Sequence, residues 1–309
     1  MKGFVGVTDN DWFAFLSQQP EIDEVNFWQP HAGQPFKALD PGEPFFFKLH
    51  SPLNYIAGVG YFAHYTILPI SIAWDTFREK NGAASLEEMR NLIDRFRRNR
   101  FAPVHDYQIG CILLEQPVFL GREDWIPAPE DFSSNIVRGK RYDLTAGIGK
   151  SFWDQVQLRI QARPIAIQEK EFLETRDRYG FPITVIPRLG QGSFRIMVTD
   201  AYQRRCAVTQ ERTLPALEAI HIKPYSHSGP HRVDNGILLR SDIHKLFDTG
   251  YVTITPDCRF EVSRRIRQDF ENGRDYYAMN GRTLVLPLKK EFQPSPHFIE
   301  WHNENTFLG

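Results

Sequence analysis

Three side chains capable of acid–base and metal chemistry lie close together in the last third of the sequence. His221 and Asn235 flank a loop rich in Gly, Pro and Ser, and His244 precedes Asp248 by four residues. A neutral imidazole can take a proton from water near the working pH, so His221 is the candidate general base. Residues four apart on a helix project from one face, which makes His244 and Asp248 candidate ligands of one metal ion. The set suits phosphodiester hydrolysis, in which a base activates water and a cation absorbs charge on the phosphate.

The neighbouring polar residues leave several roles open. Asn235 can tie the backbone of the loop and so orient His221, or it can supply a metal-ligand oxygen. Glu218 is an alternative to Asn235 for completing the ligand set. Arg240 could steady the scissile phosphate, because a guanidinium forms charge-assisted hydrogen bonds with phosphate oxygens.

A β–loop–β–helix unit is expected to carry these residues. The apolar run that starts at Leu217 reads as a short strand that delivers His221. Asn235 and Gly236 open a second apolar run, which reads as the partner strand, and the segment around His244 reads as a helix. A further helix is expected from Ser193 to about Arg205.

Residues 186–309 resemble the HNH, or ββα-metal, endonucleases. His221, Asn235 and His244 fall at the three signature positions of that family, in the expected Pro, Gly and Leu-Leu context. The resemblance implies that these three residues are catalytic. It also implies a divalent metal, Mg²⁺ or Mn²⁺, with Ni²⁺, Co²⁺ or Zn²⁺ as further possibilities. The implied ligands are His244, Asp248 and Asn235, and the implied phosphate-binding residues are Arg240 and Arg195.

The sequence departs from the family pattern at two places. Many members have Asp or His immediately before the base, where this chain has Ile220. The Cys-x-x-Cys zinc clamp found in many members is also absent, because Cys206 is followed three residues later by Thr209. The metal set is therefore the part of the pattern that these departures affect most.

Length and composition favour a reduced protein of two domains. The chain has 309 residues and a formal net charge of -1, so a nucleic-acid surface would have to be a local patch. Its three cysteines are far apart, which argues against a disulfide framework. No stretch reaches the roughly 20 apolar residues of a membrane span, and no signal peptide is evident. We expect a cytoplasmic α+β protein with domains 1–185 and 186–309.

The first half carries aromatic and apolar runs that suit strands. Asn26-Phe27-Trp28, the run at 45–49 and the run at 56–62 resemble the PUA-like superfamily, which includes EVE, ASCH and SRA domains, over about residues 20–145. In those domains a small curved β-barrel grips nucleic acid, and several members hold an extruded modified base. The resemblance implies a curved β-barrel with flanking helices in residues 1–185.

A pocket for an extruded base needs aromatic walls and polar groups at the edge of the base. The candidate walls are Trp28, Tyr61, Phe62, Trp74 and Trp125, and the candidate polar groups are Asn26, His50, Ser51 and Asn54. Aromatic residues also build cores, and most of these could do so. Trp28 is the strongest pocket candidate, because polar residues follow it directly.

Together these features predict a modification-dependent DNA endonuclease. The first domain would read a modified base in double-stranded DNA, with a substituted cytosine as the expected target, and the second would cut nearby. Such an enzyme would restrict modified foreign DNA, as in phage defence, and one active site per chain implies a homodimer. Two alternatives stay open: a nickase that reads unmodified DNA, and a DNA-binding module that has lost activity.

Overall fold

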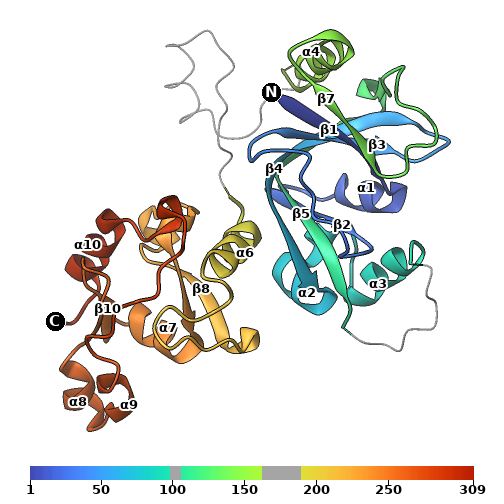
Figure 1. The fold of residues 1–309 in the computed structure, drawn as a ribbon. Helices are drawn as coiled ribbons and strands as arrows, with labels where there is room; N and C mark the ends of the chain where they lie inside the picture. The colour runs from blue at the N-terminus through green and yellow to red at the C-terminus, as the bar shows by residue number, and fades with distance from the viewer. Residues whose placement is uncertain (98–105, 162–188) are drawn as a thin grey trace. The chain divides into compact units, whose positions relative to one another are not determined.

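The computed structural model describes residues 1–97, 106–161 and 189–309 (Figure 1). The chain divides into two compact units, Met1–Pro187 and Arg188–Gly309. Strands and helices are mixed in both units, which confirms the expected α+β class. Among the described residues, no helix has the length and apolar character needed to cross a membrane.

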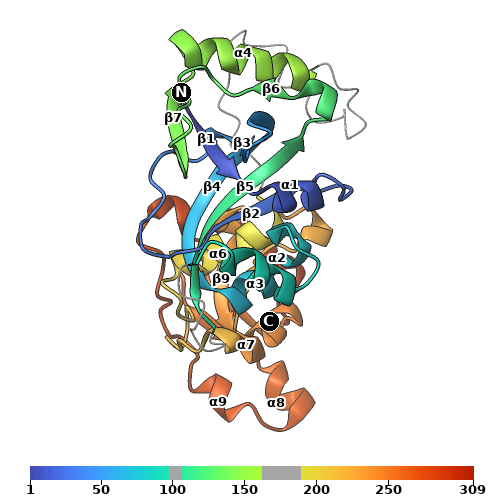
Figure 2. The same ribbon diagram turned by 90° about the vertical axis from the view of Figure 1, so that its right-hand side faces the viewer.

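The first unit is built on one sheet whose long central strands are curved (Figure 2). Its strands are β1 (Lys2–Thr8), β2 (Glu24–Gln29), β3 (Pro44–Leu49), β4 (Tyr55–Pro69), β5 (Gln108–Phe119), β6 (Ile126–Pro127) and β7 (Gly139–Asp143). Their order is β2-β5-β4-β3-β1-β7, with β6 paired to β4, and β1 runs parallel to β3. The pairings among the described strands do not join β2 to β7, so they leave the sheet open between its two end strands.

Strand β3 lies at the centre of the core of the first unit. Phe45, Phe46 and Phe47 are all fully buried, as expected for a continuous apolar run covered on both faces. Side chains alternate along a strand, so Phe46 points to one face and contacts Phe152 of α4 (Gly147–Gln161). Phe47 points to the other face and stacks on Phe119 of β5.

Short helices cover the sheet of the first unit. They are α1 (Asn10–Leu16), α2 (Ile70–Phe77) and α3 (Leu86–Asp94), with 3₁₀ turns at Arg78–Asn81 and Arg122–Asp124. Asp9 caps α1 by accepting hydrogen bonds from two backbone N–H groups in its first turn. Ser85 caps α3 in the same way and begins the helix where the sequence places a capping box.

The second unit contains the β–loop–β–helix arrangement expected from the sequence. Its strands are β8 (Leu217–His221), β9 (Gly236–Arg240), β10 (Val252–Ile254) and β11 (Phe260–Val262), and its helices are α6 (Gln191–Ala201), α7 (Ser241–Asp248), α8 (Arg265–Phe270), α9 (Arg274–Tyr277) and α10 (Pro296–Asn305). Its 3₁₀ turns are Leu214–Ala216, Tyr225–His227, Val233–Asn235 and Lys290–Phe292. Helices α6 and α7 both pack against the β8–β9 hairpin, and the hairpin residues join one hydrophobic core with Phe194 and Phe247.

A buried histidine joins α10 to the rest of this core. His302 is only 2% exposed, and its ring stacks on Phe247 with 3.7 Å between ring centroids. Its Nε2 lies 3.0 Å from the carbonyl oxygen of Phe247, and its Nδ1 lies 2.8 Å from Thr253 Oγ1. Burial lowers the pKa of His302 from about 6.5 to about 4, so the folded protein holds this ring neutral at pH 7.

This depressed pKa makes the folded state less stable in acid. Between pH 6.5 and 4 the unfolded chain binds a proton at His302 that the folded protein does not, so stability falls as the pH falls. Lowering the pH from 7 to 5 should therefore reduce the free energy of unfolding by about 2 kcal/mol more in the wild type than in a His302→Gln variant. Urea unfolding followed by circular dichroism at both pH values measures this difference. Equal responses to pH in the two proteins would contradict the prediction.

Candidate active site

The β8–β9 hairpin places the predicted base at its loop end. His221 pairs with Gly236 at that end, and Leu217 pairs with Arg240 at the other. A Cβ atom on Gly236 would lie 2.3 Å from Val198 Cγ2, so glycine is needed for α6 to approach β9 this closely. The close approach places Phe194 of α6 flat against the ring of His221, with 3.9 Å between ring centroids and 8° between planes.

Asn235 holds the loop between the two strands. Its Oδ1 accepts a hydrogen bond from the backbone N–H of Lys223 at 2.9 Å. Its Nδ2 donates to the carbonyl oxygens of Lys223 and Pro230, both at 3.0 Å. The side chain is fully buried and all three contacts are to backbone atoms. This geometry corresponds to the loop-tying role rather than to a metal ligand, because the amide oxygen is turned into the protein.

The ring of His221 is held in a neutral form. Its Nε2 lies 2.9 Å from Nδ1 of His231, and Phe194 covers one face of the ring. Burial, followed by the effect of the neighbouring His231, lowers the pKa of His221 from about 6.5 to about 4. A neutral imidazole at pH 7 retains one unprotonated nitrogen, which is the requirement for a general base.

The sequence pattern did not single out His231, which lies in the loop between β8 and β9. The structure brings His231 against His221 and stacks it on Tyr225, with 4.7 Å between centroids and 13° between planes. Its position directly after Pro230, whose carbonyl Asn235 holds, fixes its place in the loop. The sequence does show a second histidine in the loop that follows His221. Its spacing from His221 does not show that the loop folds back and brings the two rings together.

His244 lies between two carboxylates. Its Nε2 is 2.8 Å from Asp248 Oδ2, one turn along α7, and its Nδ1 contacts Glu218 of β8. The hydrogen bond with Asp248, followed by the one with Glu218, raises the pKa of His244 above its usual value. The structure thus brings Glu218 to His244, as the sequence allowed, and keeps Asn235 away from this group.

The base and the carboxylate group both include residues of strand β8. Glu218 and His221 are three residues apart on β8, so their Cα atoms are about 10 Å apart. Phe194 of α6 stacks on His221, whereas His244 of α7 contacts Glu218. The two motif histidines therefore have different neighbours, and β8 connects the two groups.

The chemistry of the group around His244 fits a divalent cation. Carboxylate oxygens are preferred ligands of Mg²⁺ and Mn²⁺, and an imidazole nitrogen suits Zn²⁺, Ni²⁺ and related transition metals. The side chains of Glu218 and Asp248 are 41% and 53% exposed, so an ion with its water ligands can reach them. Within the described ranges no three His, Cys, Asp or Glu side chains already form a metal-binding group. A cation would therefore bind one ring nitrogen of His244 in place of its proton, together with the carboxylate of Glu218 or Asp248 that contacts this nitrogen.

The two predicted phosphate-binding arginines are placed away from His221. Arg240 lies at the far end of the hairpin, four residue pairs or about 13 Å from His221. Its guanidinium makes a two-pronged ion pair with Asp242, and this pairing lowers the pKa of that carboxyl. Arg195 is an exposed residue of α6, next to Phe194. Arg195 is thus the better placed of the two for a phosphate near the base.

The positions where the sequence departs from the family pattern are structural. Ile220, which stands where many HNH endonucleases have a ligand, is 4% exposed and packs in the core. Cys206 is fully buried and its sulfur accepts a hydrogen bond from the backbone N–H of Thr209 at 3.4 Å, which closes the turn at this point. Neither position offers a ligand to a metal.

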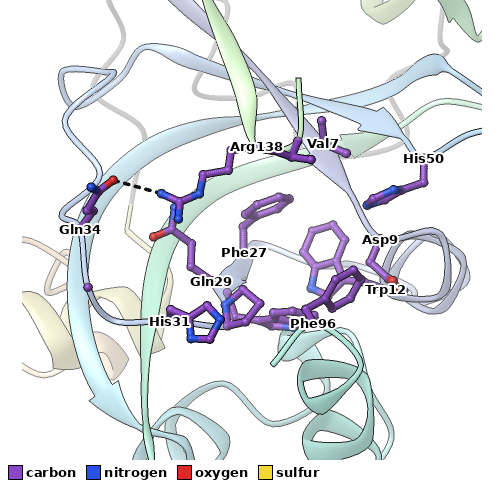
Figure 3. Close-up of a pocket in the computed structure, with 14 residues that line it drawn as sticks. Val7, Asp9, Trp12, Phe27, Gln29, His31, Gln34, His50, Phe96 and Arg138 are labelled. Atoms are coloured by element: carbon purple, nitrogen blue, oxygen red, sulfur yellow. Dashed lines mark hydrogen bonds between the residues drawn. The ribbon is translucent and has the colours of Figure 1, made fainter. Parts of the chain in front are cut away.

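The first unit contains a pocket of about 840 Å³ (Figure 3). It opens where β1, β2 and α1 meet, and its volume suits a small-molecule or nucleotide ligand. Aromatic rings of Trp12, Phe27, Trp28 and Phe96 line it together with the polar residues Asp9, Gln29, His31, Gln34, His50 and Arg138. Arg138 Nη1 donates to Gln34 Oε1 at 3.1 Å across one side, as the dashed line in Figure 3 shows.

Two residues predicted for the base pocket, Trp28 and His50, line this pocket, and seven do not. Asn26 is fully buried and donates to Asn81 Oδ1 at 2.8 Å. Phe62 and Trp74 are core residues, and Trp125 packs on Phe13. Ser51 is exposed before Pro52, Tyr61 is half-buried on β4, and Asn54 accepts a hydrogen bond from Lys48. Each of these seven is buried in the core, lies on another part of the sheet, or lies in a turn or loop outside the pocket lining.

Comparison with known proteins gives a family match in the second unit. Residues 206–255 match the model of a family described as HNH endonuclease, and this range contains β8, β9 and α7. A search of the curated proteins found none that matches the chain.

Several solved structures are similar at low identity. A mutant of the ASCH protein from Zymomonas mobilis is 10% identical, with a TM-score of 0.32, and the match covers 50% of this chain and 99% of that one. A second structure of the same ASCH protein has 10% identity and a TM-score of 0.26, covering 39% and 74%. A structure titled modification-dependent TagI restriction endonuclease has 13% identity and a TM-score of 0.27, covering 99% of this chain and 81% of that one.

The loop clamp can be tested by removing the amide of Asn235. An Asn235→Ala variant loses three buried hydrogen bonds and leaves backbone groups of Lys223 and Pro230 unsatisfied, so we expect a loss of about 2 to 4 kcal/mol in the free energy of unfolding. Asn272→Ala, at an exposed position, should change it by less than about 0.5 kcal/mol. Urea unfolding of both variants measures the difference, and similar small effects would contradict the clamp.

Proposed function

We propose that this chain, whose residues 206–255 match the HNH endonuclease family, is a modification-dependent DNA endonuclease. The second unit would hydrolyse phosphodiester bonds and the first would read a modified base, with a substituted cytosine as the expected target. The observation that carries the nuclease assignment is the position of His221 at the loop end of β8, against Phe194 and His231 and within the matched range.

The proposed chemistry places His221 as the general base. Its unprotonated ring nitrogen takes a proton from water, and the resulting hydroxide attacks phosphorus in line with the leaving 3′-oxygen. The bond between phosphorus and the 3′-oxygen breaks, which gives one end with a 5′-phosphate and one with a 3′-hydroxyl. Phe194 and Asn235 support this role because they hold the ring and the loop in place. Arg195, an exposed residue next to Phe194, would contact a phosphate that approaches this end of the hairpin.

A divalent cation would be held by His244 with Asp248 or Glu218. When bound, it supplies positive charge that stabilises the phosphate and the leaving oxygen in the transition state. Mg²⁺ or Mn²⁺ is the proposed ion, with Ni²⁺, Co²⁺ or Zn²⁺ as substitutes.

The pocket of the first unit supports the reader role. An extruded base needs stacking surfaces and polar groups at its edge, and the pocket offers Phe27, Trp28 and Trp12 for the first need. Gln29 and Gln34 provide amide donors and acceptors for the second. We place the modified base there, and we propose a homodimer for double-strand cuts, because one chain carries one candidate active site.

The nuclease assignment predicts that His221→Ala will lower the cleavage rate by about 10² to 10⁴-fold, since it removes the general base. Plasmids that are unmodified, or carry methylcytosine or hydroxymethylcytosine, are incubated with each protein and with Mg²⁺, Mn²⁺, Co²⁺ or Ni²⁺. His297→Ala, an exposed histidine of α10, should cut at the wild-type rate. If the wild type binds DNA but does not cleave it with any of these metal ions, the result would instead support a DNA-binding module that has lost activity.

The reader assignment predicts that blocking the pocket removes the preference for modified DNA. Gly33 lines the pocket, and a Cβ atom added there meets no atom within 4 Å, so Gly33→Trp introduces a bulky ring at the pocket without a clash at Cβ. Gly33→Ala is the matched control that leaves the pocket open. On a His221→Ala background, we expect Gly33→Trp to lose at least about tenfold in affinity for a modified duplex relative to Gly33→Ala. Equal binding of modified and unmodified duplexes by the unblocked protein would support the nickase alternative.

A further inference from the structure

We propose that His231 is a positioning residue that fixes the tautomer of His221, so that Nδ1 of His221 is the nitrogen that accepts the proton from water. This inference rests on the proposed nuclease function, and it assigns a role to a residue that the sequence pattern left out. It starts from one contact, the 2.9 Å separation between His221 Nε2 and His231 Nδ1.

The chemistry of that contact allows two arrangements. Two neutral imidazoles at hydrogen-bond distance share one proton between the facing nitrogens. If Nε2 of His221 carries the proton and donates it, Nδ1 of His221 is unprotonated and can act as a base. If Nδ1 of His231 carries it, Nε2 of His221 is used as an acceptor and its Nδ1 holds a proton, so His221 has no nitrogen left to accept one from water. A catalytic His221 therefore requires His231 to be the acceptor.

The surroundings of both rings restrict them to this contact. Phe194 stacks on His221 at 3.9 Å, and Tyr225 stacks on His231 at 4.7 Å, so a partial rotation of either ring out of its plane would lose a stacking partner. The two rings meet at 59° with 4.9 Å between centroids, a geometry that suits an edge-to-edge hydrogen bond. The pair is thus preorganised before any substrate binds.

The loop backbone holds the spacing between the two rings. Asn235 binds the backbone of Lys223, two residues after His221, and the carbonyl oxygen of Pro230, one residue before His231. The intervening turn requires glycine at position 229, because a Cβ there would lie 1.8 Å from the carbonyl oxygen of Lys223. A buried amide and a tight turn therefore set the distance at which the imidazoles meet.

The same contact assists the step after proton transfer. When Nδ1 of His221 takes a proton, the ring becomes an imidazolium and its Nε2–H bond to His231 becomes charge-assisted and stronger. This stabilises the charge that develops on the base as the water is deprotonated. Removing His231 would leave Nε2 of His221 without that acceptor and would let the ring sample both tautomers.

Nuclear magnetic resonance of ¹⁵N-labelled protein tests the tautomer directly. Long-range ¹H–¹⁵N correlation spectra at pH 7 should show a protonated Nε2 and an unprotonated Nδ1 for His221 in the wild type. In His231→Ala the same ring should show averaged nitrogen shifts. A wild-type His221 protonated at Nδ1 would overturn the proposal, whether or not the protein cuts DNA.

Cleavage kinetics test the consequence. We expect His231→Ala to lower kcat by about 10- to 100-fold with KM within about twofold of the wild type, because ground-state DNA binding does not use this contact. His231→Gln, whose amide oxygen can accept from Nε2, should recover part of the loss. His227→Ala is the matched control, since His227 is an exposed histidine of the same loop, and it should keep the wild-type kcat.

The outcomes separate this inference from the proposed function. An unchanged kcat in His231→Ala, beside a His221→Ala variant that is inactive, overturns the positioning role and leaves the nuclease assignment intact. A wild type that does not cut any duplex overturns the nuclease assignment, while the spectra still report the tautomer. A thermal unfolding scan of each variant identifies any that loses activity through unfolding, and His231→Gln then serves in place of His231→Ala.

Discussion

The buried amide of Asn235 is the constraint on which the candidate active site depends. It gives both its donor hydrogens and its acceptor oxygen to the backbone of Lys223 and Pro230, and so closes a loop that has little regular structure of its own. Leaving such backbone groups unpaired in the protein interior costs free energy, so the amide specifies one loop conformation. His221 and His231 lie beside its two anchor points, and their contact follows from that conformation.

The two motif histidines have opposite environments, and this difference separates their roles. His221 lies among aromatic rings next to a second imidazole, which keeps it neutral. His244 lies between Asp248 and Glu218, which favours positive charge at that point. A proton acceptor needs the first environment and a cation-binding group needs the second. Strand β8 contributes to both, because it carries His221 and also Glu218, which contacts His244.

In the first unit, the aromatic residues are shared between a core and a pocket. Phe45 and Phe47 of β3 are fully buried, whereas Phe27 and Trp28 of the edge strand β2 line the pocket. Phe27 packs directly on Phe45, with 4.7 Å between ring centroids, so the wall of the pocket continues from the core. A wall held in this way keeps its shape without a ligand, which suits recognition by stacking.

The sequence by itself determined the local chemistry: the β–loop–β–helix order, the identities of His221, Asn235 and His244, and the match of His244 with Asp248 one helical turn away. These follow from short-range periodicity and from residue types with few alternative uses. The tertiary structure alone decided that His231 meets His221, that Asn235 binds backbone rather than metal, and that Trp28 lines a pocket while Trp74 is buried. Loop closure and the packing of distant elements set those contacts, and neither leaves a periodic signal in the sequence.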